Sequence, residues 1–213
     1  LHEVRIAGMR AKDLVKQILA FSRQSDQEVK PIRLQSILKE TLKLLRPSIP
    51  QTIDIRMDVE TDCDTILADA TQIHQVIMNL CTNAYHAMQD CGGQLEIVLK
   101  QIKLETDQCQ SLGLLQGDYA LLKVIDTGTG INEELMEKLF DPYFTTKGIG
   151  KGTGLGLSVV QGIVKSFHGN IQIQSEPLKG TTVSVYLPIM TRRGKQILSE
   201  KTYPVMKGSM SLT

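Results

Sequence analysis

The sequence predicts an α/β fold, a two-layer α/β sandwich in which helices cover one face of a mixed β-sheet. Three observations support it. Segments with helical and with strand periodicity are intermixed along the chain, and the last two expected strands are separated by a short turn, as in a hairpin. A chain of 213 residues with 41% hydrophobic and 22% charged residues is large enough for one medium domain plus a smaller element.

The smaller element is one long helix, expected over residues 1–25. Residues 26–30 form a polar linker, residues 31–190 are expected to form the sandwich, and residues 191–213 form an unpatterned C-terminal linker or tail. Apolar residues in the helix recur every three or four positions, a seam that requires a partner helix: Val4, Ala7, Ala11, Leu14, Ile18 and Phe21.

Inside the sandwich, each expected element has its own signal. Residues 34–45 have helical periodicity and are closed by Pro47 and Pro50. Residues 53–59 alternate apolar and polar side chains, as in a half-buried strand. The remaining elements follow in order: a helix at 69–89, strands at 95–99 and 119–125 joined by a polar connection at 105–118, helices at 133–139 and 155–167, and strands at 170–174 and 182–187.

Composition excludes several classes of partner. A net charge of +1 gives no electrostatic basis for binding nucleic acid or an anionic membrane. No apolar run reaches the ~20 residues of a membrane span. The four cysteines have no CxxC spacing, so we expect reduced, structural thiols and a cytoplasmic location, with which a membrane anchor elsewhere in a full-length protein is compatible.

The helix expected at 69–89 has two different faces. Gln75, Asn79, Asn83 and His86 share one face, because they lie three or four residues apart. Two asparagine carbonyls one turn apart suit a hard cation such as Mg²⁺, which takes its other ligands from water and substrate phosphates. In isolation, a plain solvated helix face explains the same residues.

Two further segments could contact a ligand. Asp126, Gly128 and Gly130 follow an apolar strand, where a carboxylate could accept a hydrogen bond from an exocyclic amine; a simple tight turn is the alternative. Five glycines on alternate positions, from Gly148 to Gly156, lead into the next helix, whose N-terminus would favour phosphate.

Taken in their order along the chain, these segments over residues 31–188 strongly resemble the catalytic, ATP-binding domain of sensor histidine kinases. The resemblance implies the fold shared with Hsp90-like and gyrase-like ATPases, known as the Bergerat fold. It implies ATP and Mg²⁺ as cofactors. It also implies that Asn79 and Asn83 hold the metal, while His86 stands where the family often has a residue touching phosphate.

The same resemblance assigns the rest of the site. Asp126 would bond the adenine amino group, Gly128 and Gly130 would shape the adenine site, and Thr181 would line it. Residues 140–152 resemble the family's ATP lid, with the remaining nucleotide-binding candidates on it or just after it: Lys147, Lys151, Gly152, Gly154, Leu155 and Gly156.

The phosphoacceptor histidine of such kinases is not expected on this chain. His2 is followed by Ile6-Ala7-Gly8-Met9 instead of the acceptor pattern, and residues 10–23 resemble the end of the second helix of the dimerisation hairpin. His74 and His168 are expected to be structural. Related ATPases that hydrolyse ATP commonly carry a glutamate at the position of Asn79, and since an amide is no general base, efficient hydrolysis is not expected.

The implied function is transfer of the ATP γ-phosphoryl group to a histidine on a dimerisation helix, for relay to the aspartate of a response-regulator receiver domain. A homodimer is expected for the full-length protein. Two alternatives stay open at this point: a nucleotide-binding fragment that is silent in isolation, and a serine kinase of the anti-sigma type on the same fold.

Overall fold

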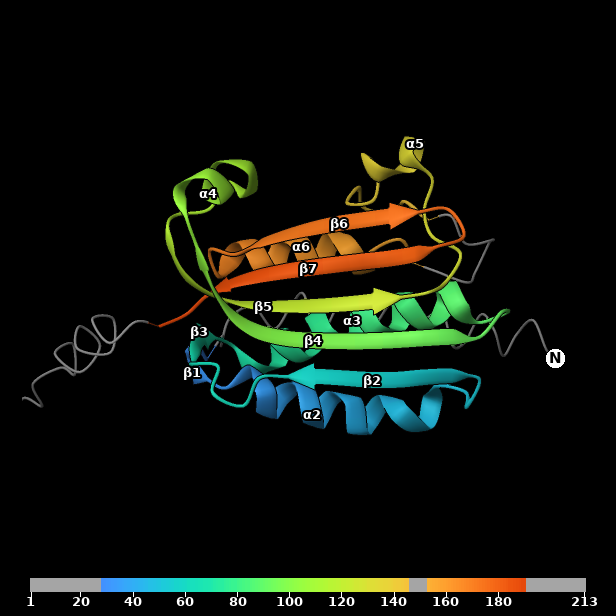
Figure 1. Cartoon of the computed structure of the whole chain (residues 1–213), viewed down its shortest axis with the longest axis horizontal. Coiled ribbons are helices and arrows are strands. Elements are labelled where there is room, and N and C mark those ends of the chain that lie inside the picture. Colours follow the sequence, from blue (N-terminus) through green and yellow to red (C-terminus); the bar gives the residue numbers. More distant parts are fainter. Residues whose placement is uncertain (1–27, 146–152, 191–213) are drawn as a thin grey trace, which may run out of the picture.

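The computed structural model describes residues 28–145 and 153–190, which form a five-stranded mixed sheet with helices packed on it, beside a small two-stranded sheet (Figure 1). The helix expected at 1–25 and the tail expected at 191–213 lie outside the described residues, so the domain boundaries proposed from the sequence stay predictions.

The main sheet has the strand order β2-β4-β5-β7-β6. Strand β2 (Ile53–Val59) pairs in parallel with β4 (Gly93–Leu104), and β4 pairs antiparallel with β5 (Gly117–Asp126). Strand β7 (Gly180–Pro188) lies antiparallel between β5 and β6 (Asn170–Glu176). The prediction of a mixed sheet ending in a hairpin is therefore confirmed.

Three helices cover one face of this sheet: α2 (Leu34–Leu45), α3 (Ala70–Met88) and α6 (Gly156–Ser166) (Figure 1). Their apolar sides share a single core with inward-facing residues of β4, β5 and β7. A one-turn 3₁₀ helix, η2 (Arg46–Ser48), follows α2 at the proline expected to close it. Helix α5 (Glu133–Met136) is shorter than the expected span of 133–139.

The small sheet was not expected from the sequence. It pairs β1 (Lys30–Ile32) antiparallel with β3 (Ile66–Ala68). Each strand has only three residues, and β1 begins at the last residue of the expected linker. Periodicity cannot reveal strands this short.

The polar connection expected at 105–118 contains a helix that its pattern does not indicate, α4 (Thr106–Leu112). Glu105 and Gln108 form a capping box at its start, and Gly113 ends it at φ 60°. This helix packs on the face of the sheet opposite α3, because its partners alternate along β5 with the residues of the main core. Two residues of α4 belong to a second hydrophobic cluster, separate from the main core. This cluster consists of Leu104, Cys109, Leu112, Tyr119, Leu121 and Tyr186.

All four cysteines are free thiols, of which Cys63, Cys81 and Cys109 are buried and Cys91 is exposed. Burial raises the pKa of the Cys81 thiol to about 12, so this side chain behaves as a small apolar core residue. Within residues 28–145 and 153–190, no helix is both long and apolar enough to cross a bilayer.

Candidate functional site

The site begins with helix α3, whose start is fixed by a side chain. The Asp69 carboxylate accepts hydrogen bonds from the backbone N–H groups of Thr71 (2.8 Å) and Gln72 (3.1 Å), which caps the helix. The apolar side of the helix is buried against the sheet, and Asn79, Asn83 and His86 are partly exposed. The two-faced helix predicted from the sequence is therefore present.

Gly156, the first residue of α6, lies directly beside this asparagine face. A Cβ atom built on Gly156 would be 3.7 Å from Nδ2 of Asn83 and 3.8 Å from Oδ1 of Asn79. The residues are more than 70 positions apart in the sequence. The packing of α6 on α3 thus brings the end of the glycine-rich segment to the two asparagines.

The N-terminus of α6 is a candidate position for an anion. Its N-cap, Leu155, provides no side-chain hydrogen bond to the helix. The first N–H groups of a helix have no intrahelical partner and carry partial positive charge. An anionic group between this helix end and the asparagine face would have N–H donors on one side and amide groups on the other.

The turn after β5 carries the second polar group of the site. The Gly128 N–H donates to Oδ1 of Asp126 at 2.9 Å, and Asp126 is buried at the end of its strand. The turn is attached to α3, since the Thr129 N–H donates to the carbonyl of Ala87 at 3.1 Å. The carboxylate and the asparagine helix are therefore held in one framework.

Thr181 lies opposite Asp126 in the pairing of β5 with β7, and both side chains are buried. Its hydroxyl is 2.8 Å from the Ser175 hydroxyl. Ser175 Oγ also donates to the carbonyl of Gly180 and accepts from the Ile131 N–H, each at 2.9 Å. Ser175 thus ties the Asp126 turn to β7. Sequence reasoning missed it, and no local pattern distinguishes this serine from others in strands.

Glycine is required at two positions of the turn because backbone approaches closely. A Cβ on Gly128 would be 2.6 Å from the carbonyl oxygen of Ala87. A Cβ on Gly130, which has φ 65°, would be 2.0 Å from the carbonyl oxygen of Glu176. These glycines set the distance between the turn and its neighbours.

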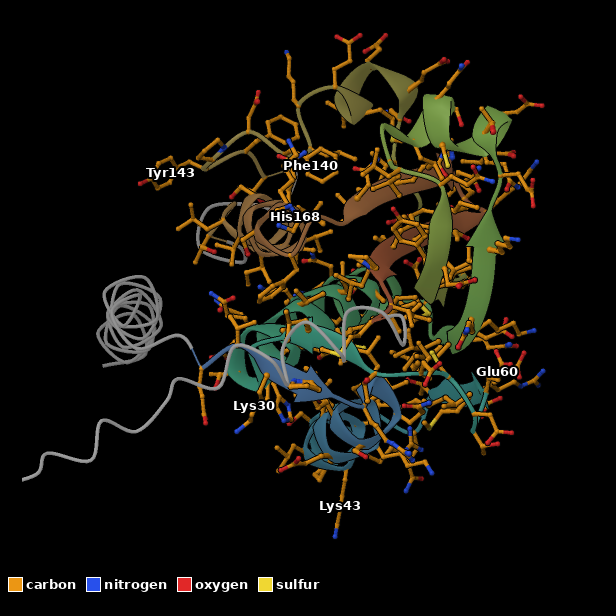
Figure 2. The ribbon with its side chains drawn as sticks, turned by 90° about the vertical axis from the view of Figure 1, so that its left-hand side faces the viewer. Lys30, Lys43, Glu60, Phe140, Tyr143 and His168 are labelled. Carbon is orange, nitrogen blue, oxygen red and sulfur yellow. The ribbon has the colours of Figure 1, made fainter. Side chains whose placement is uncertain are left out.

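Tyr143, within the first residues of the predicted lid, is hydrogen-bonded to Gly154, which lies just after the lid. The Tyr143 N–H donates to the carbonyl of Gly154 at 3.0 Å, and these residues have φ values of 70° and 68°. Figure 2 shows Tyr143 projecting from the body of the protein, and its side chain is exposed, whereas Phe140 packs against the main core. Lys147, Lys151 and Gly152 lie outside the described residues and stay predictions.

Besides His86, the part of the chain that the structure describes contains His74 and His168, and both occupy structural positions. Nδ1 of His74 is 2.6 Å from the hydroxyl of Thr41, which joins α3 to α2. His168 lies in the turn after α6 with φ 58°, and its N–H donates to the carbonyl of Lys165. Neither lies on the asparagine face of α3.

The chemistry of the donor set fits a hard cation that is shared with a ligand. Among the described residues, no cluster of three or more His, Cys, Asp or Glu could hold a metal by itself. Two amide side chains alone are an incomplete ligand set, but Mg²⁺ commonly takes few protein ligands and completes its shell with water and substrate phosphates. The asparagine pair therefore suits Mg²⁺ only together with an anionic ligand.

Asp126 gives a prediction for the dependence of stability on pH. Burial raises the pKa of its carboxyl group above the ordinary value, an effect partly opposed by the N–H groups of Gly128 and Thr181. The folded state therefore binds this proton more tightly than the unfolded state, and the stabilisation is lost as pH rises through the raised pKa. The Asp126→Asn variant, which cannot ionise, should gain stability relative to the wild type as the pH rises from the ordinary carboxyl pKa of about 4 through the raised pKa.

Urea unfolding of both proteins without nucleotide, at several pH values in that range, checks this prediction. A stability difference that stays constant across the range would contradict it.

Comparison with known proteins identifies relatives of this site. Residues 68–191, more than half of the chain, match the family described as "Histidine kinase-, DNA gyrase B-, and HSP90-like ATPase". The sensor kinase CckA of Brucella abortus (strain 2308) is 41% identical over 180 residues, which cover 84% of this chain and 19% of CckA. The chain thus spans about a fifth of the length of this curated relative.

Solved structures agree with the sequence matches. The nucleotide-free catalytic domain of histidine kinase ThkA is 29% identical, with a TM-score of 0.61 over 76% of this chain and 95% of that domain. A structure of ThkA in complex with the response regulator protein TrrA is 27% identical, with a TM-score of 0.63 over 84% of this chain and 47% of the matched chain.

Proposed function

Because this chain belongs to the histidine kinase-, DNA gyrase B- and HSP90-like ATPase family, with a catalytic domain of the sensor histidine kinase type, we propose that it binds Mg-ATP and donates the γ-phosphoryl group to a histidine on a dimerisation helix. ATP binding is a property of the family. The role of each residue, the Mg²⁺ ion and the histidine acceptor are what we propose for this chain.

The observation that carries the proposal is the position of Gly156 beside Asn79 and Asn83. This position puts the N-terminus of α6 beside the two amide side chains, so a triphosphate with its cation would contact both. Phosphoryl transfer depends mostly on positioning and on neutralising charge, so such a site needs no nucleophile of its own.

Each group has a defined task in this proposal. Asn79 and Asn83 hold Mg²⁺, which neutralises charge on the phosphates when bound. The N–H groups at the start of α6 orient the phosphates. The Asp126 carboxylate accepts a hydrogen bond from the adenine amino group, and the backbone N–H groups of Gly128 and Thr181 keep that carboxylate in place.

Two partners follow from the proposed activity. The histidine acceptor belongs to a dimerisation hairpin. The support for this hairpin is the apolar seam in the sequence of residues 1–25, which requires a partner helix, and a homodimer of the full-length protein is expected. The second partner is a response-regulator receiver domain. The structure of ThkA with the response regulator TrrA supports that choice by homology.

The decisive experiment supplies a two-helix hairpin that carries the acceptor histidine, together with the full chain and ATP labelled on its γ-phosphate. Acid-labile label on the hairpin is the expected result. Binding of ATP without transfer would favour the silent nucleotide-binding alternative, and acid-stable label would favour a serine kinase, to which no comparison points. The Asn83→Ala variant should lose both Mg-ATP binding and transfer.

The Gly156→Ala variant distinguishes an effect on nucleotide binding from an effect on the stability of the fold. The added methyl group would be at ordinary contact distance from Asn79 and Asn83, so the thermal midpoint should stay within about 3 °C of the wild type. The methyl group would occupy the space proposed for the phosphates, so Mg-ATP affinity should fall about 10-fold or more.

Isothermal titration and thermal unfolding of the same samples measure both quantities. Gly162→Ala is the matched control, because a Cβ on this residue of the same helix would meet nothing within 4 Å beyond the backbone of its own helix and its chain neighbours. It should bind ATP normally. Unchanged affinity in Gly156→Ala would place the phosphates elsewhere.

A further inference from the structure

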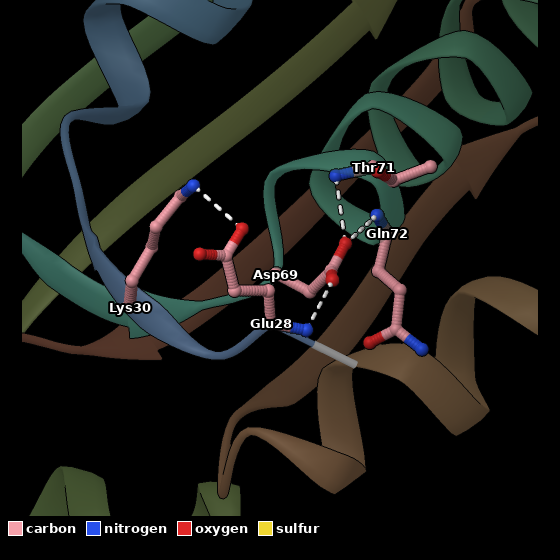
Figure 3. Close-up of polar contacts among 5 residues, drawn as sticks. All are labelled: Glu28, Lys30, Asp69, Thr71 and Gln72. Carbon is pink, nitrogen blue, oxygen red and sulfur yellow. Dashed lines mark hydrogen bonds and ion pairs between the residues drawn. The ribbon is translucent and has the colours of Figure 1, made fainter. Parts of the chain in front are cut away.

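Asp69 does more than cap α3, because its second oxygen has a partner from another part of the chain. Oδ1 accepts from the N–H groups of Thr71 and Gln72, and Oδ2 accepts from the backbone N–H of Glu28 at 3.1 Å. Figure 3 shows the carboxylate between the first turn of α3 and the segment at Glu28. One buried carboxylate thus joins two segments that are 41 residues apart.

The adjoining residues strengthen this joint. From Lys30 to Ile32 the chain pairs with β3, which ends at Ala68, next to Asp69. The inward-facing residues Ile32, Ile66 and Ala68 are buried in the main core. The segment that leads in from the N-terminal side is therefore attached along the three residues of β3 and to Asp69, the N-cap of α3.

We propose that Asp69 is a positioning residue that couples the segment entering at Glu28 to nucleotide binding on α3. The proposal rests on the function proposed above, in which Asn79 and Asn83 on the same helix bind Mg-ATP. A capped α-helix moves largely as one body, so a change at its first turn is felt two to three turns later at the asparagines.

Coupling of this kind is reciprocal. If Mg-ATP binds more tightly when Glu28 is attached to Asp69, then Mg-ATP must also hold that attachment closed by the same factor. Typical coupling factors in proteins begin at about 5-fold. A role of Asp69 in stability alone predicts no such matching pair of effects.

The chain offers substitutions that remove one half of the joint. Glu28→Pro removes the N–H donor together with the Glu28 side chain, and it leaves the cap of α3 intact. Glu28→Ala is its control, since it keeps the N–H group and loses only the exposed ion pair with Lys30. Asp69→Ser keeps a good N-cap but has no second oxygen for Glu28.

The experiment uses the full chain and the non-hydrolysable ATP analogue AMPPNP with Mg²⁺. Hydrogen–deuterium exchange of the Lys30 and Ile32 amides is followed with and without AMPPNP, and AMPPNP affinity is measured by titration. In the wild type and in Glu28→Ala, AMPPNP should slow exchange of these amides by about 5-fold or more. In Glu28→Pro and Asp69→Ser the slowing should disappear, and AMPPNP affinity should fall by the same factor.

The possible failures are distinguishable. If the wild type binds Mg-AMPPNP but exchange of Lys30 and Ile32 is unchanged, the coupling is wrong and the proposed function stands. If Glu28→Pro and Asp69→Ser lose the slowing but keep full affinity, reciprocity fails and the coupling is overturned. If the wild type does not bind Mg-AMPPNP, the proposed function falls and the coupling falls with it.

Discussion

Asp126→Asn is expected to weaken ATP binding by about 10- to 100-fold, the range of a hydrogen bond to a charged group. In the proposed site the buried carboxylate accepts from the adenine amino group. An asparagine still accepts from the Gly128 N–H through its oxygen, but its NH₂ group then faces the amino group of adenine, so that two donors meet.

Inosine triphosphate makes this prediction sharper, because a carbonyl oxygen replaces the adenine amino group. The wild type should reject it, since carboxylate and carbonyl are both acceptors. The asparagine variant should bind it better than the wild type does, which reverses the preference. Competition of ATP and inosine triphosphate against a fluorescent nucleotide measures both affinities.

Asp118→Asn is the matched control, at the opposite end of the same strand. It should leave both affinities unchanged. An Asp126→Asn variant that keeps the wild-type preference for ATP would show that this carboxylate does not contact the base.

The sequence predicts those helices and strands whose hydrophobic pattern and capping residues lie within one continuous segment of the chain. Helix α3 was expected over 69–89 and is observed over Ala70–Met88, because nineteen residues with an aspartate cap and a two-faced pattern admit few other structures. The same holds for β2, which matches its expected bounds of 53–59.

Elements that depend on distant partners were missed. Strands β1 and β3 exist only because they pair with each other across more than thirty residues. Helix α4 has few apolar residues of its own, and it is stabilised by its capping box and by contact with Leu121 and Tyr186 on the outer face of the sheet. Neither kind of partner can be read from a short window of sequence.

The residues of the candidate site also fall into two groups, those that the sequence suggests and those that only the packing of distant segments reveals. Residue types and order suggested Asn79, Asn83 and Asp126 as candidates, and the family resemblance added Thr181. Spacing along the chain could not show that Gly156 lies beside both asparagines. That proximity arises from the packing of α6 on α3. Ser175 was missed for the same reason, since its importance comes only from the three groups that its hydroxyl joins.

Gly128→Ala is expected to destabilise the protein strongly, because the turn that carries Gly128 lies directly against α3. Its Cβ would lie 2.6–2.7 Å from the carbonyl oxygen, the carbonyl carbon and the Cβ of Ala87. These atoms belong to the backbone and the Cβ of the last turn of α3, so neither rotamer change nor a small shift relieves the overlap. We expect a loss of about 2–3 kcal/mol, or a fall of roughly 4–12 °C in the thermal midpoint.

The same overlap should also weaken nucleotide binding, which distinguishes it from a purely local defect. Relief of the clash requires the Asp126 turn to move away from α3, and the carboxylate and the asparagine face then separate. Gly162→Ala provides the control, because it adds a methyl group to an exposed helix position with no neighbour within 4 Å and should stabilise the protein by about 0.5–1 kcal/mol. If Gly128→Ala unfolds and binds ATP like the wild type, the close contact between the turn and Ala87 is not what holds the two halves of the site together.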